Sequence, residues 1–199
     1  MIQQDIEKQL TDAELVRLTL CDAVNFASLV ERYETKLMRY VCRFTLGDRQ
    51  LAEDIFQESM IKVYRNLNGY NPKWSFSGWI YRIFRNEALN QLRRRKLQNT
   101  VSLDCDDENG FSLLTLLTDG EELVDKAKKH ETEEKVRQLL SQLRQDYREV
   151  LILRFLEERD YNEISFILQK PVGTVGVLLQ RAKADFRQLA IKYNLLYNE

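Results

Sequence analysis

Apolar residues return at every third or fourth position over most of this chain, a spacing that places them on one face of a helix. The first such stretch follows Thr11-Asp-Ala-Glu14, which has the form of an N-terminal capping box. Its apolar positions are Leu15, Leu18, Ala23, Phe26, Leu29, Val30 and Tyr33. A second segment runs from Lys36 to Thr45 and ends at Gly47, a residue suited to a helix C-cap. The pattern predicts that helices fill the N-terminal part.

The next predicted helix runs from Arg49 to Leu67, with Asp48 placed to cap its start. Its apolar face consists of Ala52, Ile55, Phe56, Met60, Val63, Tyr64 and Leu67. The opposite face begins with acids and an amide, namely Glu53, Asp54, Gln57 and Glu58. Lys62 and Arg65 follow near its end. Because this order of charges suits the helix dipole, an ordinary surface helix explains it equally well.

A third helix is predicted from Ser77, which can cap it, after Asn71-Pro72-Lys73 breaks the chain. At about 100° per residue, one side of this helix is apolar and buried, with Ile80, Tyr81, Phe84, Ala88 and Leu92. The outward side is predicted to carry Trp79, Arg82, Asn86, Asn90 and Arg93. Arginine, asparagine and tryptophan are the groups that hold phosphates, read base edges and stack on an unpaired base.

The loop before this helix adds Lys73, Trp74 and Phe76. Aromatic side chains in a loop beside a basic helix are suited to trapping single-stranded bases, and each stacked base is worth roughly 1–3 kcal/mol. Two alternatives remain open from the residues alone. The helix could be a solvated one with a basic end, and Trp74 and Phe76 could simply plug the loop onto the core.

From Leu97 to about Lys129 the chain becomes acidic and turn-forming, with Asp104-Cys-Asp-Asp-Glu-Asn-Gly110 as its centre. This composition predicts a linker, interrupted by a short apolar island from Phe111 to Leu117 that could dock on a partner or on either domain. A solubilising tether explains the same composition.

A second helical unit is predicted to begin near Glu133. Two amphipathic helices are indicated by Val136, Leu139, Leu140, Leu143, Tyr147, Val150, Leu151, Leu153 and Phe155. Capping boxes are expected at Asp146 with Glu149 and at Asp160 with Glu163. A short helix then carries Ile164, Ile167 and Leu168, Gln169-Lys-Pro171 makes a turn, and a longer helix buries Val175, Leu179, Ala182, Phe186 and Leu189. Two helices joined by a tight turn predict a helix-turn-helix, whose second helix enters the DNA major groove.

Composition narrows the classes of function. With 199 residues, 44% of them hydrophobic, the chain can bury a core and hold one or two small all-α domains. Its net charge is −1, so affinity for nucleic acid must come from local patches. Three cysteines without metal-ligand spacing and one histidine predict no metal, no cofactor and no Cys-His catalysis, and Cys21 and Cys42 are expected to be buried filler. No apolar run reaches the ~20 residues of a membrane span, which predicts a cytoplasmic protein.

Two stretches resemble the promoter-melting domain of bacterial sigma factors, and of the small extracytoplasmic-function (ECF) class in particular. They are Leu51-Ala-Glu-Asp-Ile-Phe-Gln-Glu-Ser-Met-Ile-Lys-Val-Tyr-Arg-Asn-Leu67 and Phe76-Ser-Gly-Trp-Ile-Tyr-Arg-Ile-Phe-Arg-Asn-Glu-Ala-Leu-Asn-Gln-Leu-Arg-Arg-Arg-Lys96. Tyr147-Arg-Glu-Val-Leu-Ile-Leu-Arg154, Tyr161-Asn-Glu-Ile164 and Pro171-Val-Gly-Thr-Val175 resemble that family's minus-thirty-five domain. The resemblance implies a region 2 domain at residues 1–97, an acidic linker at 98–132 and a region 4 domain at 133–199.

The resemblance also implies roles for particular residues. Glu53, Asp54, Gln57 and Glu58 would belong to the face that docks on core RNA polymerase. The separated strand of the minus-ten element would be bound by Lys73, Trp74, Phe76, Trp79, Arg82, Asn86, Asn90 and Arg93. The family usually has Asp where this chain has Asn90, so the base preference of that position is expected to differ.

In the second domain, the resemblance implies that Thr174, Val177, Gln180 and Arg181 face the minus-thirty-five element. After Gly173-Thr-Val175 the family usually places Lys or Arg, then Ser, then Arg, but this chain has Gly176-Val-Leu178. Losing two such contacts would weaken binding by ~2–4 kcal/mol. We therefore expect weak or altered minus-thirty-five reading, with Gln180 inclined to adenine.

The leading hypothesis is a dissociable initiation subunit that performs no bond chemistry and has core RNA polymerase, promoter DNA and an anti-sigma factor as partners, without membrane insertion. Two alternatives come from other classes. One is a helix-turn-helix regulator that binds only duplex DNA, and the other is a sigma-like sequestering protein. Polymerase binding and the ability to support transcripts distinguish the three hypotheses.

Overall fold

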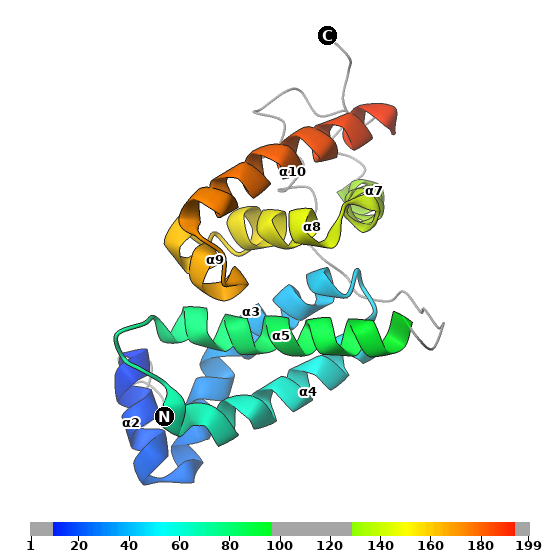
Figure 1. The fold of residues 1–199 in the computed structure, drawn as a ribbon. Coiled ribbons are helices and arrows are strands. Elements are labelled where there is room, and N and C mark those ends of the chain that lie inside the picture. The colour runs from blue at the N-terminus through cyan, green and yellow to red at the C-terminus, as the bar shows by residue number, and fades with distance from the viewer. Residues whose placement is uncertain (1–9, 97–128, 194–199) are drawn as a thin grey trace. The chain divides into compact units, whose positions relative to one another are not determined.

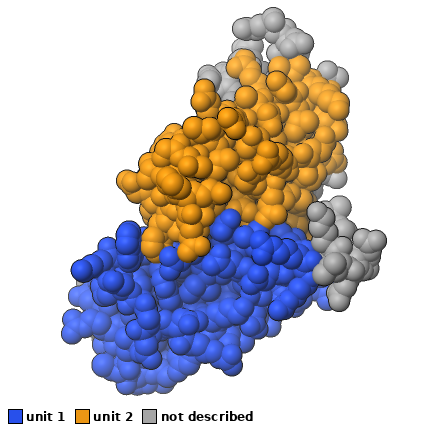
Figure 2. Space-filling model, viewed as in Figure 1, with its two compact units in different colours: residues 1–41, 50–100 blue, residues 42–49, 101–199 orange. Residues whose placement is uncertain are grey.

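The computed structural model describes residues 10–96 and 129–193. Every regular element in these two ranges is a helix, and neither range contains a strand, so the predicted all-α class is confirmed (Figure 1). The chain divides into two compact units, coloured separately in Figure 2. Unit 1 comprises residues 1–41 and 50–100, and unit 2 comprises residues 42–49 and 101–199. Within the described ranges, no helix is both long enough and apolar enough to cross a membrane.

Unit 1 is built from three long helices and shorter elements around them, although the last residues of α3 and the first residue of α4 fall in unit 2. The elements are α2 (Asp12–Cys21), η1 (Ala23–Asn25), α3 (Phe26–Phe44), α4 (Arg49–Asn66), η2 (Leu67–Gly69) and α5 (Phe76–Lys96). The first predicted stretch divides into α2, η1 and the start of α3, and α3 then continues through Glu34 and Thr35 into the second predicted segment. Glu34 and Thr35 are polar and exposed, and neither is a helix-breaking Gly or Pro, so the helix continues through them.

The capping box at the start of α2 is confirmed. The Thr11 hydroxyl accepts a hydrogen bond from the Glu14 amide at 3.3 Å, and the Glu14 carboxylate accepts one from the Thr11 amide at 2.7 Å. The Thr11 hydroxyl also donates to the Glu14 carboxylate at 2.7 Å, and this bond, followed by the one from the Thr11 amide, lowers the pKa of Glu14. At the end of α3, Gly47 adopts a φ of 92° and its amide donates to the Cys42 carbonyl at 2.9 Å, so the predicted helix stop is also confirmed.

The core of unit 1 forms where α5 packs against α3 and α4. Tyr40 of α3 and Tyr81 of α5 have ring centroids 5.0 Å apart, and Phe56 of α4 lies 5.6 Å from Phe84 of α5. The buried residues include Leu15, Leu29, Leu37, Val41, Ile55, Val63, Ile80, Tyr81, Phe84 and Ala88. The helical spacing therefore identified four residues of the α5 core face, Ile80, Tyr81, Phe84 and Ala88, whereas the predicted Leu92 is half-buried. Cys21, which was expected to be buried, is exposed because it is the last residue of α2.

Unit 2 contains α7 (Lys129–Gln142), α8 (Gln145–Leu151), the π-helical turn η4 (Ile152–Leu156), α9 (Tyr161–Leu168) and α10 (Val172–Lys192). The start of α7 at Lys129 precedes the predicted start near Glu133, so the end of the expected 98–132 linker is helical. The rest of that linker, with the Phe111 to Leu117 island, lies outside the described residues.

The capping box expected at Asp146 and Glu149 is wrong. Helix α8 begins after Arg144, whose side chain makes no cap hydrogen bond. Because the helix begins at Gln145, Asp146 lies inside its first turn and is not the N-cap. Glu149 is buried, and its carboxylate accepts a hydrogen bond from the Gln145 side chain at 2.9 Å.

The helix-turn-helix of unit 2 is capped at the start of α9 and makes a tight turn between α9 and α10. The Asp160 carboxylate accepts hydrogen bonds from the amides of Asn162 at 2.7 Å and Glu163 at 2.8 Å, as the predicted capping box requires. Helix α9 ends at Leu168 with Gln169 as its C-cap, whose φ is 54°, and Pro171 directly precedes α10. The buried side chains beneath these helices include Val150, Leu151, Leu153, Ile164, Ile167, Val175, Leu179, Ala182 and Phe186.

We expect Asp160→Ala to lower the free energy of unfolding by about 1 kcal/mol, because two amides at the start of α9 lose their acceptor. Urea denaturation followed by circular dichroism measures this change. Asp160→Asn keeps a side-chain acceptor and serves as the matched control. Equal stability of Asp160→Ala and the unmodified chain would contradict the assigned cap.

Candidate nucleic-acid interface

An aromatic cluster holds the start of α5 to the loop that precedes it. The Phe76 ring lies 5.5 Å from Trp79, 5.3 Å from Tyr70 and 5.5 Å from Tyr33, measured between centroids. Tyr70 and Trp79 are 5.6 Å apart. Only 2% of Phe76 and 7% of Trp79 remain exposed. Both side chains therefore belong to the interior of unit 1.

This placement corrects two predictions. Trp79 was expected on the outward side of α5, and Phe76 was expected in the loop as a base trap. Phe76 is instead the first residue of α5. Helical side chains lean toward the N-terminus, so Trp79, in the first turn, covers Phe76 and meets Tyr70 rather than pointing straight out from the helix. A helical projection of the sequence at a fixed angle per residue includes neither the lean of the side chain nor the loop against which Trp79 packs.

Local hydrogen bonds hold the loop between Tyr70 and Ser75 in one shape. The Trp74 amide donates to the Asn71 carbonyl at 3.0 Å, and the Lys73 amide donates to the Asn71 side chain at 3.0 Å. The Tyr70 hydroxyl donates to the Trp74 carbonyl at 2.7 Å. At the far end, the Ser75 hydroxyl accepts from the Gly78 amide at 2.9 Å, so Ser75 caps α5 in place of the predicted Ser77.

The loop presents Trp74 to solvent, with 55% of this residue exposed beside the exposed Lys73. Desolvation, followed by the nearby charge of Asp12, raises the pKa of Tyr70, which keeps its phenol protonated as the donor to Trp74. Asp12 is itself held by the Tyr33 hydroxyl at 2.6 Å and by Arg32 at 2.9 Å. Sequence reasoning missed Tyr70, although an aromatic residue directly before Asn71-Pro72 was an available signal.

The outward face of α5 is polar and basic next to this loop. Asn86, Asn90 and Arg93 are exposed and Arg82 is half-buried, so four of the five residues predicted for this face lie on it. The one acid of the helix, Glu87, is 2% exposed and pairs with Lys62 of α4. The Gln91 side chain donates to the other Glu87 oxygen at 2.8 Å. Because Glu87 is turned inward, no carboxylate of α5 opposes an approaching phosphate.

The acidic positions predicted for polymerase docking lie on α4. Glu53, Asp54 and Gln57 are exposed, and Glu58 is half-buried with its carboxylate 3.9 Å from the Lys62 ammonium group. Leu51, Ala52 and Ile55 fill the opposite, buried side of the same turns. The structure thus separates an acidic surface on α4 from a basic surface on α5 within one unit.

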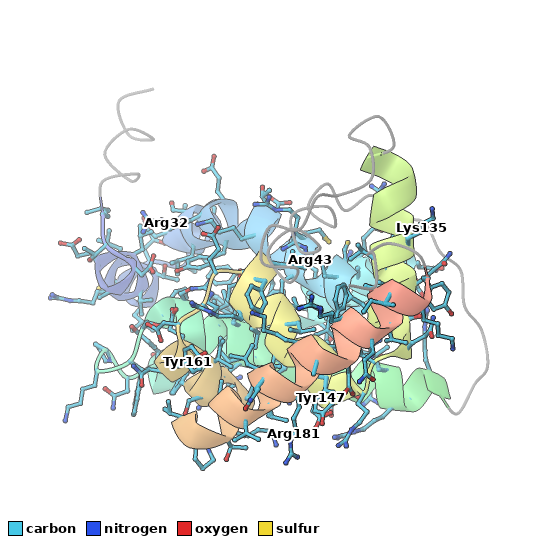
Figure 3. The ribbon with its side chains drawn as sticks, turned by 90° about the horizontal axis from the view of Figure 1, so that it is seen from above. Arg32, Arg43, Lys135, Tyr147, Tyr161 and Arg181 are labelled. Atoms are coloured by element: carbon cyan, nitrogen blue, oxygen red, sulfur yellow. The ribbon has the colours of Figure 1, made fainter. Side chains whose placement is uncertain are left out.

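In unit 2, helix α10 presents the residues predicted to face DNA. Thr174, Val177, Gln180 and Arg181 are all exposed, and Arg181 points away from the body of the unit in Figure 3. Gly176 lies beside Tyr161 of α9, because a Cβ added at Gly176 would be 3.8 Å from the tyrosine ring. The Arg154 guanidinium sits over the same ring, 5.6 Å from its centroid. The candidate interface of unit 2 therefore combines one helix face with this tyrosine.

Comparisons with known families agree with the two-part division. Residues 29–98 match the family described as Sigma-70 region 2, and residues 133–186 match Sigma-70, region 4. The chain is 30% identical over 164 residues to the ECF RNA polymerase sigma factor SigW of Bacillus subtilis, covering 82% of this chain and 87% of that relative. It is 34% identical over 184 residues to the RNA polymerase sigma-H factor of Pseudomonas aeruginosa, covering 92% and 93%.

Solved structures with the same fold include two complexes. One is CnrH bound to the cytosolic domain of CnrY, with a TM-score of 0.66, 19% identity and coverage of 91% of this chain and 97% of that one. The other is the sigma factor RpoE with the anti-sigma factor NepR from Bartonella quintana, with a TM-score of 0.62, 18% identity and coverage of 83% and 96%. At these identities the likeness concerns the fold.

The aromatic cluster predicts opposite outcomes for the two tryptophans. Trp79→Ala should lower the free energy of unfolding by about 3 kcal/mol, because it empties a buried site next to Phe76 and Tyr70. Trp74→Ala should change it by less than about 0.5 kcal/mol, because an exposed side chain contributes little packing. Chemical denaturation of both variants makes the comparison. Equal losses would refute the assignment of Trp79 to the core and Trp74 to the surface.

Proposed function

Because the chain belongs to the ECF RNA polymerase sigma factors, which direct promoter-specific transcription initiation, we propose a separate task for each of its exposed polar surfaces. The observation that carries this proposal is the ordered loop that holds Trp74 in solvent beside the basic face of α5. The two family matches support domains at residues 1–97 and 133–199 with the acidic segment 98–132 between them. The start of α7 at Lys129 adds the last residues of that segment to the second domain.

The Trp74 loop captures an unpaired base of the minus-ten element. Trp74 offers a flat apolar surface, and Lys73 supplies a cation for the adjacent phosphate. The Tyr70 hydroxyl and the Asn71 side chain fix the loop before DNA arrives, so little ordering is required on binding. Phe76 and Trp79 act from beneath as positioning residues and need not touch DNA.

The α5 face continues the same strand path beyond the loop. Arg82 and Arg93 are placed for phosphates, and Asn86 and Asn90 carry amides that can hydrogen-bond base edges. Asn90 brings a donor where an Asp would bring only acceptors, and it adds no negative charge to the basic face. A melted strand is thus held by stacking at one end of α5 and by phosphate contacts along the helix.

The acidic face of α4 binds core RNA polymerase. Glu53, Asp54 and Gln57 present acceptors along one exposed helix face, which suits a basic helical surface on the enzyme. Bond chemistry belongs to the core enzyme, and the chain acts without catalysis of its own, in the cytoplasm where the polymerase works. Unit 2 binds duplex DNA upstream through Thr174, Val177, Gln180 and Arg181.

An anti-sigma factor is a further proposed partner. One solved relative of the same fold is a sigma factor in complex with an anti-sigma factor. A protein that covers α4 or α10 of this chain would compete directly with polymerase or promoter DNA, so sequestration and initiation would exclude each other.

Trp74→Ala should weaken holoenzyme binding to a promoter fragment with a pre-melted minus-ten region by about 1–3 kcal/mol, or roughly 5- to 150-fold. Transcript yield in vitro from duplex promoters in a randomised library should fall in parallel. Trp74→Phe keeps an aromatic ring and is the matched control, expected to retain most of the activity. The measurements are equilibrium binding and single-round transcription with core polymerase.

Two results would count against this role. If Trp74→Ala binds the pre-melted fragment as well as the unmodified chain, the loop does not capture a base. If the unmodified chain binds core polymerase but produces no transcript from any promoter, a sequestering role replaces initiation.

Reversing the charge of two exposed acids on α4, with Glu53→Lys and Asp54→Lys together, should weaken binding to core polymerase by about tenfold or more. Each reversal removes an attraction of about 0.2–1 kcal/mol, the range for exposed charge pairs, and adds a repulsion. Glu31→Lys with Glu34→Lys, at exposed acids of α3, is the control for a change in net charge. Fluorescence anisotropy with labelled chain measures the affinity, and equal losses in both double variants would contradict the assignment of α4.

A further inference from the structure

Val177 occupies the middle of the exposed face of α10. The buried side of this helix carries Val175, Leu179 and Ala182, whereas 47% of Val177 is exposed. Thr174 and Arg181, one turn before and one turn after Val177, are exposed on the same side. The centre of this polar face is therefore an apolar side chain.

The position along the helix is that of a base-reading residue. Val177 lies in the second turn of α10, directly after the tight turn formed by Gln169 to Pro171. In a helix-turn-helix, the first residues of the second helix contact base edges in the major groove. Gly176 adds no side chain next to Val177, and the ring of Tyr161 occupies the space beside that glycine. Val177 is thus the side chain that projects from this turn.

The chemistry of valine restricts what it can contact there. The major-groove edges of guanine, cytosine and adenine present hydrogen-bonding groups, and only thymine presents a methyl group. An isopropyl group placed on a polar edge removes water from it without replacing the lost hydrogen bond, which costs free energy. The same group placed on a thymine methyl buries apolar surface on both partners.

We propose that Val177 reads the 5-methyl group of a thymine in the minus-thirty-five element, so that an apolar contact provides specificity where Gly176-Val177-Leu178 carries no cation. This inference rests on the proposed binding of duplex DNA by unit 2. Gln180 follows Val177 by three residues on the exposed surface, and its amide suits the N6 and N7 edge of adenine. The two residues together select neighbouring A·T pairs.

A protein partner fits this face less well than DNA does. Val172, the other exposed valine of α10, lies about 140° around the helix from Val177, so the two do not form one apolar surface. The immediate neighbours of Val177 on the exposed side are Thr174, Gln180 and Arg181. A single apolar group surrounded by hydrogen-bond donors is complementary to a thymine methyl between polar base edges and phosphates.

The test uses the full chain bound to core polymerase. The preferred upstream element is first selected from a library of promoters with randomised upstream duplex. Each thymine of that element is then replaced by deoxyuridine, which removes only the methyl group. At the thymine that Val177 contacts, the replacement should weaken holoenzyme binding by about fourfold, the value expected for one buried methyl group. At the other thymines the loss should be below about 1.5-fold.

Two variants attribute this loss to Val177. In Val177→Ala, thymine and deoxyuridine should bind within about 1.5-fold of each other, because the contacting methyl groups are gone. Val177→Arg should also lose the distinction while binding more tightly at low salt, so it remains measurable if Val177→Ala binds weakly. Val24→Ala, at an exposed valine of unit 1, is the matched control and should keep the fourfold difference.

The outcomes separate this inference from the proposed function. If no upstream duplex element is selected, DNA binding by unit 2 fails and the inference fails with it. If an element is selected but every deoxyuridine binds like thymine, the inference alone is wrong. It is also wrong if the methyl effect persists unchanged in Val177→Ala, which would assign the contact to another residue. If the exposed face of α10 instead binds a protein partner, Val177→Ala will weaken that complex and leave promoter affinity unchanged, which overturns the proposal.

Discussion

The burial of Trp79 against Phe76 and Tyr70 is the contact on which the candidate interface depends. It fixes the first turn of α5 and places the Tyr70 hydroxyl where it donates to the Trp74 carbonyl. An exposed tryptophan on a mobile loop would lose much of its stacking energy to the ordering of that loop. Here the contacts in the interior of unit 1 order the loop before binding, so binding does not have to. One tryptophan therefore packs in the interior while the other stays exposed on the loop.

The helices and most of the core were predictable from the sequence because they depend on local spacing. Ile80, Tyr81, Phe84 and Ala88 recur at helical intervals and are buried as expected. Trp79 was not predictable in this way, because its burial depends on Tyr70, which lies in a separate segment. An aromatic residue near a helix end satisfies the patterns of both a stacking surface and a core, and only the tertiary contact distinguishes them.

Capping motifs illustrate the same limit. The boxes at Thr11 and Asp160 form as the sequence predicts, because each of these residues directly precedes the first residue of its helix. At α8 the expected partner, Glu149, is buried and bonded to Gln145, so the same spacing has a different result. Of the residues predicted to bind DNA, the exposed polar residues of α5 and the loop residues Lys73 and Trp74 lie where the sequence predicts, whereas Phe76 and Trp79 are buried. Neighbours in the sequence predict where a side chain lies only when that side chain remains on the surface.

Glu87 affects the distance between the acidic surface of α4 and the basic surface of α5. Its carboxylate is buried on α5 and is paired with Lys62 of α4. Sliding one helix along the other would leave a charge in an apolar environment, which costs several kcal/mol. The acidic surface of α4 and the basic surface of α5 are therefore held at a fixed distance from each other. If polymerase binds the α4 surface, the α5 surface is presented to the melted strand at a constant position relative to the enzyme.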